Sequence, residues 1–213
     1  MKTQYHRAIT KKALDKYFSV SALEDIVSAN LGQDALRYQF GHDHFHYDSN
    51  SFVAGDAYCY DLRRMIVVAL QAEDILAARG AFGRLTHTVQ DFYAHSNYVS
   101  LWRDIYPDAA PAEIEPELTL VLSHPRLHSG KLYYPLEIFA FVDALKAYIL
   151  PLLPRDSHAW MNVDDPSRPN FEYAFSAAVK KTSLEYQRLI ATISMREVIL
   201  LTGLENKQQG DTL

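Results

Sequence analysis

The sequence is poor in cysteine, in basic charge and in long apolar runs. Cys59 is the single cysteine among 213 residues, so an internal disulfide and a cysteine-based zinc finger are both excluded. No apolar stretch approaches 18 residues, which predicts that no segment spans a membrane. The net charge is −5 without a basic stripe, so nucleic acid is not an expected partner. No apolar run follows Met1, and this lack of a signal peptide predicts a cytoplasmic protein, with export by another route left open.

Hydrophobic residues make up 48% of the chain, which is enough for the core of one domain. Outside the loops their spacing is helical, and no stretch is a convincing strand. We therefore expect a single all-α domain over residues 1–213, a multi-helix bundle of undetermined oligomeric state. Residues 103–134 hold four prolines and are predicted to form a long loop or lid over the metal face, and 206–213 a frayed tail. The helices are expected over 4–18, 21–30, 56–78, 81–102, 135–150 and from 170 onward.

Histidine is abundant, and its clearest arrangement lies in the helix expected over 81–102. His87, Asp91 and His95 follow one another at intervals of four residues. Four residues turn a helix by about 400°, so all three side chains share one face. His87 and Asp91, roughly 6 Å apart along the axis, can bind one ion, whereas His87 and His95 are about 12 Å apart. The spacing predicts at least two ions bridged by Asp91, unless these histidines merely pair with other side chains.

A second concentration of histidine falls in residues 42–48, which lack any period and are predicted to form a loop. The stretch holds three histidines and two aspartates in seven residues. This composition indicates a metal-binding loop, and the alternative is a solvated polar turn. We expect one or two of its histidines to bind metal and the others to orient them. The candidates are His42, His44, His46 and Asp48.

Further candidates lie outside these two clusters. His6 falls on the apolar side of the first helix, where a histidine is more often hydrogen-bonded than metal-bound. A late loop carries His158, Asn162 and Asp164 within seven residues. Four other side chains are candidates for supporting the ligands or lining a pocket, although core packing is the plainer role for the aromatic ones: Tyr47, Phe52, Asn97 and Tyr98.

Three stretches together resemble the zinc-dependent phospholipase C superfamily. They are His6-x-x-Ile9-Thr10-x-x-Ala13-Leu14, the histidine-rich run at 44–48, and His87-Thr-x-Gln-Asp91-Phe-x-Ala-His95-Ser-Asn97. The His-Ser-Asn ending is most similar to the branch containing the fungal heterokaryon-incompatibility protein Het-C. The resemblance covers residues 3–100, and it implies an all-helical fold with a three-zinc cluster that hydrolyses phosphodiesters.

The resemblance also implies roles for individual residues. Asp34, His46, His87 and Asp91 match the ligands of a first zinc, His6 and Asp91 those of a second, and His95 a ligand of the third. Asp34 and Asp91 are the carboxylates expected to serve catalysis.

The sequence departs from that pattern in two places. The similar enzymes use an N-terminal amine beside the first histidine, whereas five residues precede His6, so we expect the amine to be absent or displaced. No His-x3-Glu pair follows His95, and His128 or His158, with Asp164, is expected to replace it.

The expected function is therefore a zinc-dependent phosphodiester hydrolase of the phospholipase C type. Imidazole and carboxylate donors suit two or three zinc ions, with manganese or iron possible. A metal-bound hydroxide would attack the phosphorus of a phosphodiester or phospholipid head group. Two alternatives remain open: a non-catalytic helical module held together by metal, and a single-strand nuclease.

Overall fold

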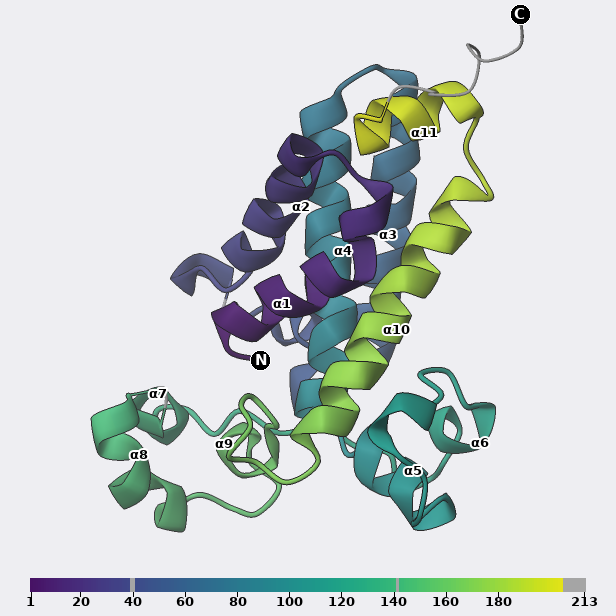
Figure 1. Cartoon of the computed structure of the whole chain (residues 1–213). Helices are drawn as coiled ribbons and strands as arrows, with labels where there is room; N and C mark the ends of the chain where they lie inside the picture. The colour runs from purple at the N-terminus through teal and green to yellow at the C-terminus, as the bar shows by residue number, and fades with distance from the viewer. Residues whose placement is uncertain (39–40, 141, 205–213) are drawn as a thin grey trace, which may run out of the picture.

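The computed structural model describes residues 1–38, 41–140 and 142–204, and every regular element in these ranges is helical (Figure 1). The all-α class predicted from the sequence is therefore confirmed. In the described ranges, no helix has both the length and the hydropathy needed to cross a bilayer, as expected. The tail predicted over 206–213 lies outside the described residues.

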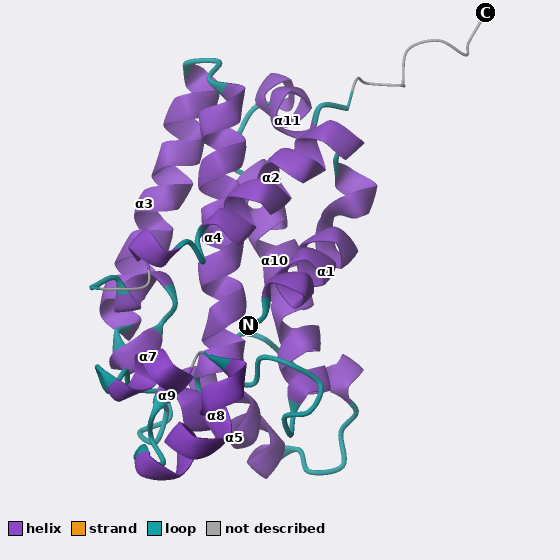
Figure 2. Ribbon diagram, turned by 90° about the vertical axis from the view of Figure 1, so that its left-hand side faces the viewer, coloured by secondary structure: helices purple, strands orange, loops and turns teal. Residues whose placement is uncertain are grey.

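The longer helices form a bundle in which α4 is central (Figure 2). α2, α3 and α10 pack directly against α4, and α1 packs against α2 and α10. The bundle helices are α1 (Thr3–Leu14), α2 (Val20–Gly32), α3 (Phe52–Gln71), α4 (Ile75–His95), α10 (Phe171–Ile190) and α11 (Met195–Thr202). The shorter helices are α5 (Tyr98–Ile105), α6 (Thr119–Leu122), α7 (Leu136–Ala140), α8 (Asp143–Ile149) and α9 (His158–Met161). Single turns of 3-10 helix are η1 (Asp15–Tyr17), η2 (Leu36–Tyr38), η3 (Asp43–Phe45), η4 (Asp48–Asn50), η5 (Pro111–Glu113) and η6 (Leu150–Leu152).

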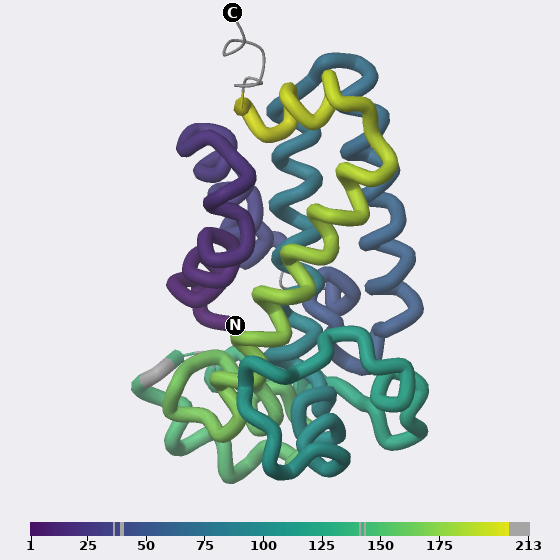
Figure 3. The backbone as a smooth tube through the Cα atoms, turned by 45° about the vertical axis from the view of Figure 1, so that its right-hand side comes forward, coloured from purple at the N-terminus to yellow at the C-terminus, as the bar shows by residue number. Residues whose placement is uncertain are grey.

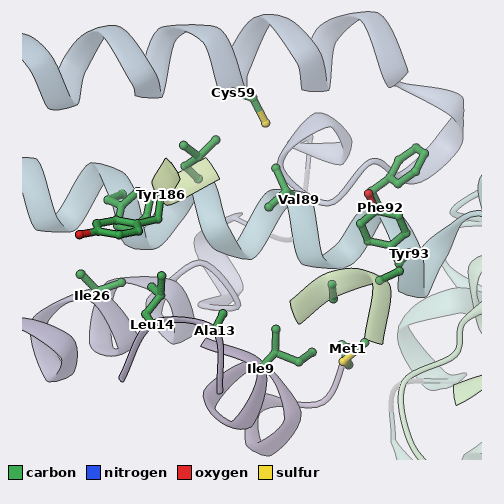
Figure 4. Close-up of a cluster of buried hydrophobic side chains, with 14 of the residues drawn as sticks. Met1, Ile9, Ala13, Leu14, Ile26, Cys59, Val89, Phe92, Tyr93 and Tyr186 are labelled. Atoms are coloured by element: carbon green, nitrogen blue, oxygen red, sulfur yellow. The ribbon is translucent and has the colours of Figure 1, made fainter. Parts of the chain in front are cut away.

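The second half of α4 is buried because neighbouring helices cover it on several sides. Every residue from Leu85 to His95 is buried. Val89 belongs to the same buried cluster as Ile26 of α2 and Tyr186 of α10 (Figure 4). Gly83 lets α2 and α4 approach closely, since a Cβ there would lie 2.4 Å from the carbonyl oxygen of Ile26.

The turn between the antiparallel helices α3 and α4 lies at a different position from the one that the sequence predicted. The expected break at Gly80 lies inside α4, and the turn instead falls at 72–74. Asp74 decides this position, because its side chain accepts a hydrogen bond from the Ala77 amide at 3.0 Å and caps α4. The second expected helix, 81–102, is interrupted at Ser96, after which α5 begins.

Segment 103–134 is anchored along its middle. Ile114 and Val121 have no exposed surface, and the Tyr93 hydroxyl of α4 donates to the Pro116 carbonyl at 2.6 Å. Farther on, Gly130 donates its amide to the His95 carbonyl at 2.9 Å, so the chain passes beside the end of α4. Movement of this segment as a lid stays a prediction, as does the single-domain organisation.

The helices α5 to α9 gather at one end of the bundle, and α11 lies at the other end (Figures 1 and 3). The last turns of α4 lie at the end that carries α5 to α9. This end receives the start of α1, the loop before α3 and the segment after α9, and it contains most of the histidines singled out above.

Candidate metal centre

The last turns of α4 carry the side chains around which the site is built. His87, Asp91 and His95 have at most 5% of their surface exposed. Their four-residue spacing places them along one helix face, as the sequence predicted. Ionisable groups this deeply buried are usually paired or bound to metal, so their partners decide what the site can do.

Four ligand atoms from four positions gather around one point. His87 Nε2 lies 2.9 Å from Asp91 Oδ2, 3.1 Å from His46 Nδ1 and 3.6 Å from Asp34 Oδ1. His46 Nδ1 lies 2.9 Å from Asp91 Oδ2. In a tetrahedral zinc site with metal–ligand bonds of about 2.0 Å, neighbouring ligand atoms are about 3.3 Å apart. The observed separations bracket that value. These four residues, which form the first group, therefore have the spacing of a tetrahedral zinc site.

Asp91 turns its other carboxylate oxygen toward a second group of polar atoms. Oδ1 lies 3.1 Å from His6 Nε2 and 3.6 Å from His95 Nε2. Asp164 Oδ1 lies 3.5 Å from the same nitrogen of His95. The Met1 amino nitrogen is 2.7 Å from Asp91 Oδ1 and 3.2 Å from both Asp164 Oδ1 and His95 Nε2. Asp91 therefore bridges the first and second groups.

The position of the Met1 nitrogen corrects an expectation from the sequence. The five residues before His6 were expected to remove an amine from the site. Instead, α1 begins at Thr3, and the His6 amide already bonds to the Lys2 carbonyl at 3.3 Å. Because the helix starts this early, Met1 and His6 are little more than one turn apart and face the same carboxylate.

Hydrogen bonds behind the second group orient two of its imidazole rings. His6 Nδ1 lies 2.7 Å from Gln90 Oε1, which can only accept, so Nδ1 carries the proton and Nε2 faces the site. His95 Nδ1 lies 3.1 Å from the His46 carbonyl oxygen and 3.3 Å from Asp48 Oδ1, so Nε2 again faces the site. Sequence reasoning missed Gln90, and its place directly before Asp91 on the ligand-bearing helix was the available signal.

Asp48 joins two histidines. Its Oδ1 lies 2.8 Å from His158 Nδ1 as well as 3.3 Å from His95 Nδ1, and all three residues are buried. These atoms are close enough to hold an ion themselves. Since His95 Nδ1 also faces a backbone carbonyl, the arrangement is better described as a carboxylate that orients two imidazoles.

Burial and neighbouring charges put two principal ligands in the protonation state that metal binding needs. Burial lowers the pKa of His87 to about 4, so its imidazole is neutral near pH 7 and offers a lone pair. Burial alone would raise the pKa of Asp91. The Met1 amino group and the histidines around Asp91 outweigh that effect and hold its pKa well below the usual range.

Two of the three loop histidines lie outside both groups. The His42 ring stacks on Phe45 with centroids 4.6 Å apart, and the His44 ring meets Tyr58 edge-on at 5.7 Å. The sequence predicted a loop without any period, but Asp43–Phe45 coil into the single turn η3. That turn sends His42 and His44 into an aromatic cluster, whereas His46 reaches the first group.

His128 and Asn97 also lie away from the ligands. His128 is exposed, and its Nδ1 lies 2.8 Å from the Arg126 carbonyl. The Asn97 side chain donates to that carbonyl at 2.8 Å and accepts from the His128 amide at 2.9 Å. Asn97 therefore supports the backbone after α6 instead of the His95 imidazole. Of the two alternatives His128 and His158, only His158 lies beside His95, with ring centroids 4.4 Å apart, and its Nδ1 contacts Asp48.

The remaining candidates are structural. Tyr47 is buried and donates its hydroxyl to Asp56 at 2.7 Å, and the Phe52 ring packs against that of Phe92 at 5.9 Å. Tyr98 is buried, and its hydroxyl accepts from the Leu118 amide at 3.0 Å. Asn162 is buried at the end of α9, between the two residues His158 and Asp164 that contact the site. The aromatic side chains thus belong to the core.

Comparison with known proteins places the chain in a family. The model of the family described as the VWA7 N-terminal domain matches residues 2–114. The chain belongs to this family. The human von Willebrand factor A domain-containing protein 7 is 37% identical over 81 residues, and its rat counterpart is 35% identical over the same length. These 81 residues are 38% of this chain and 9% of either relative. No solved structure matches the chain.

Membership of the VWA7 N-terminal domain family corrects the interpretation drawn from the motifs. The resemblance to the zinc-dependent phospholipase C superfamily and its Het-C branch is wrong, because the matching family model covers the residues that carried it. The predicted phosphodiester hydrolase, the nuclease alternative and the head-group substrate are withdrawn with it, as are the catalytic roles of Asp34 and Asp91. A four-residue spacing of ligands fixes a geometry on a helix but does not specify a reaction.

Proposed function

We propose that this chain is a metal-binding helical domain of the VWA7 N-terminal family, in which two zinc ions hold the end of the bundle together. The first ion binds the first group, Asp34, His46, His87 and Asp91. The second shares Asp91 through Oδ1 and binds His6, His95 and Asp164. Imidazole nitrogen and carboxylate oxygen are both ligands of zinc in proteins, and zinc binds them without needing a thiolate.

The observation that carries the proposal is the spacing of the first group. Four ligand atoms from three separate segments gather here, at separations of 2.9 to 3.6 Å from His87 Nε2 or between His46 and Asp91. Simple hydrogen bonding does not require a carboxylate oxygen and two imidazole nitrogens to converge in this way. A cation at their centre relieves the repulsion between lone pairs and neutralises the buried carboxylate.

The number of protein ligands supports a structural role for the ions. Structural zinc sites are closed by four protein ligands, whereas catalytic sites keep a position for water or substrate. The first group supplies four donors, and the second group supplies four side chains. These donors come from α1, the turn after α2, the loop before α3, α4 and the segment after α9. The ions would thus link these five segments at one end of the bundle.

Metal analysis of the purified chain tests the proposal. We expect two zinc ions per chain by elemental analysis after dialysis, and the visible absorption of tetrahedral cobalt after exchange. His87→Ala should remove the first ion, and Asp91→Asn should weaken both. His128→Ala is the matched control, because that histidine is exposed and lies outside both groups. A chain without stoichiometric metal, whose thermal unfolding is unchanged by added zinc, would overturn the proposal.

A further inference from the structure

The segment from Leu132 to Leu153 has an unusual composition. Of its 22 residues, 17 are hydrophobic, and the others are two prolines and Glu137, Asp143 and Lys146. It contains α7 and α8, which form a short helical hairpin. The hairpin is too short to cross a bilayer, yet it is richer in apolar residues than the chain as a whole.

Among the described apolar residues of this segment, only Ala140 and Leu153 are buried by the protein itself. The small core beneath the hairpin consists of Ala140, Leu153 and Ala159. Eight large apolar side chains on the hairpin are between 38% and 76% exposed: Tyr134, Leu136, Ile138, Phe139, Val142, Leu145, Tyr148 and Leu152. Exposed apolar side chains are ordinary when scattered, but so many within one short segment mark an interaction surface.

The hairpin is fixed to the body at its base. The buried carboxylate of Glu137 accepts the Ala159 amide at 2.6 Å, and the Lys131 amide donates to the Asp156 carbonyl at 2.8 Å. Figures 1 and 2 both show α7 and α8 at the end of the molecule, outside the bundle. The apolar surface is therefore presented outward on a tip that is held in position.

The charged and aromatic residues around the tip favour a lipid surface as its occupant. Glu137 is buried, and Lys131 pairs with Asp156 at 2.8 Å. Lys146 and Arg155 are the other basic residues here, Asp143 is the other acidic one, and Arg155 lies 3.8 Å over the Trp160 ring. Leucine, isoleucine and phenylalanine at a tip, with tyrosine, tryptophan and basic side chains beside them, are typical of segments that lie in a membrane interface.

We propose that the α7–α8 hairpin docks this domain onto the surface of a lipid bilayer, with Phe139, Tyr148 and Leu152 entering the interface. Burial of exposed apolar area drives the binding, and anionic lipid strengthens it through Lys146 and Arg155. A projecting tip can enter a fluid interface without a matching cavity. A protein partner would need a groove complementary to it, and a second copy of the chain would need the same tip to pack against itself.

Flotation with lipid vesicles tests this proposal without reference to metal content. The full chain is mixed with vesicles of phosphatidylcholine, with or without a minority of phosphatidylserine, and the bound fraction is measured. Replacing Phe139, Tyr148 and Leu152 together by serine should weaken partitioning roughly tenfold or more. The matched control replaces Val68 and Leu76 by serine, because these side chains are equally exposed near the α3–α4 turn, away from the hairpin.

Tryptophan fluorescence supplies a second measurement. Trp160 is half-buried beside the hairpin, whereas Trp102 of α5 is buried in the main core. Vesicles should shift Trp160 emission to shorter wavelength, and brominated lipid should quench it. The proposal would be overturned if the wild-type chain bound neither type of vesicle. It would also be overturned if vesicle binding fell equally in the hairpin variant and the control variant. Concentration-dependent dimerisation abolished by the hairpin substitutions, without vesicle binding, would also overturn it in favour of self-association.

Discussion

His6 Nδ1 lies 2.7 Å from Gln90 Oε1, and neither residue has any exposed surface. The Gln90 amide has one orientation here, because Nε2 donates to Thr10 Oγ1 at 3.0 Å and to Thr182 Oγ1 at 3.1 Å. The Thr182 hydroxyl has already given its proton to the Ala178 carbonyl at 2.8 Å, so it can only accept from Gln90. The amide oxygen must face His6, and this fixes the lone pair on His6 Nε2, directed at the site.

Gln90→Leu should therefore remove the second ion and spare the first. Without its acceptor, His6 loses the bond that sets its tautomer, while the first group keeps all four donors. We expect zinc content to fall from two ions per chain to one. Leaving the buried partners of the amide unsatisfied should also destabilise the fold by about 1–3 kcal/mol. Elemental analysis and urea unfolding measure the two effects. Gln187→Leu, at an exposed position of α10, is the control, and retention of both ions in Gln90→Leu would contradict the prediction.

Metal removal should lower the thermal stability of the chain. A ligand present at a hundred times its dissociation constant stabilises the folded state by about 2.7 kcal/mol. For a chain of this length, each kcal/mol corresponds to roughly 2–4 °C, so chelation should lower the melting temperature by roughly 5–10 °C. Calorimetry with and without chelator measures the change. Zinc should restore the original value, and an Asp91→Asn chain should respond much less to either treatment.

The sequence predicted the fold class and the shared face of the three α4 side chains from local periodicity. His87, Asp91 and His95 could be placed together because helix geometry alone relates them. The boundary between α3 and α4 was misplaced because Gly80, a residue that can end a helix, was preferred to Asp74, whose capping bond depends on local backbone geometry.

The rest of the site depends on contacts between distant segments. Which of three loop histidines reaches α4 was decided by the turn at η3, which a sequence without period does not reveal. His128 and His158 were equivalent candidates until the backbone bond from Gly130 to His95 fixed the path of the chain. The position of Gln90 directly before Asp91 was a weak signal, because a glutamine suits any exposed helix position and only tertiary packing makes it an orienting group.

Glu185 should be important for the attachment of α3 to α10. Its buried carboxylate accepts two bonds of 2.9 Å from Arg63 and lies 2.6 Å from the Lys181 ammonium. Glu185→Ala leaves both cations without this partner. Arg63 is partly exposed and Lys181 keeps Glu117, so we expect a loss of about 1–3 kcal/mol in unfolding free energy. Glu73→Ala, which removes an exposed pair with Arg196, should cost about 0–1 kcal/mol. Denaturant unfolding measures the unfolding free energy of both variants, and a similar decrease in the two would contradict the prediction.

Glu117 should make stability depend on pH in the acid range. Burial alone raises its pKa, but hydrogen bonds from Arg188 and Lys181 outweigh burial and lower the pKa from 4.5 to about 2. A carboxyl whose pKa is lowered by folding stabilises above its unfolded pKa, so this contribution is complete above about pH 4.5 and disappears as pH falls toward 2. Since the group is partly exposed, its contribution should be about 1–2 kcal/mol. The unfolding free energy of the wild type should exceed that of Glu117→Gln by this amount at pH 6, and the difference should vanish near pH 2.

Gly83 and Gly80 of α4 should respond oppositely to alanine. A Cβ on Gly83 would lie 2.4 Å from the Ile26 carbonyl oxygen and 2.7 Å from the Ala29 Cβ, so α2 must move away. We expect Gly83→Ala to destabilise by about 1–3 kcal/mol, since overpacking outweighs the gain in helix propensity. A Cβ on Gly80 meets only the flexible end of Arg84 at 3.6 Å, so Gly80→Ala should stabilise by about 0.5–1 kcal/mol. Urea unfolding of both variants measures the changes. If both substitutions stabilised the chain, α2 and α4 would not be in close contact at Gly83.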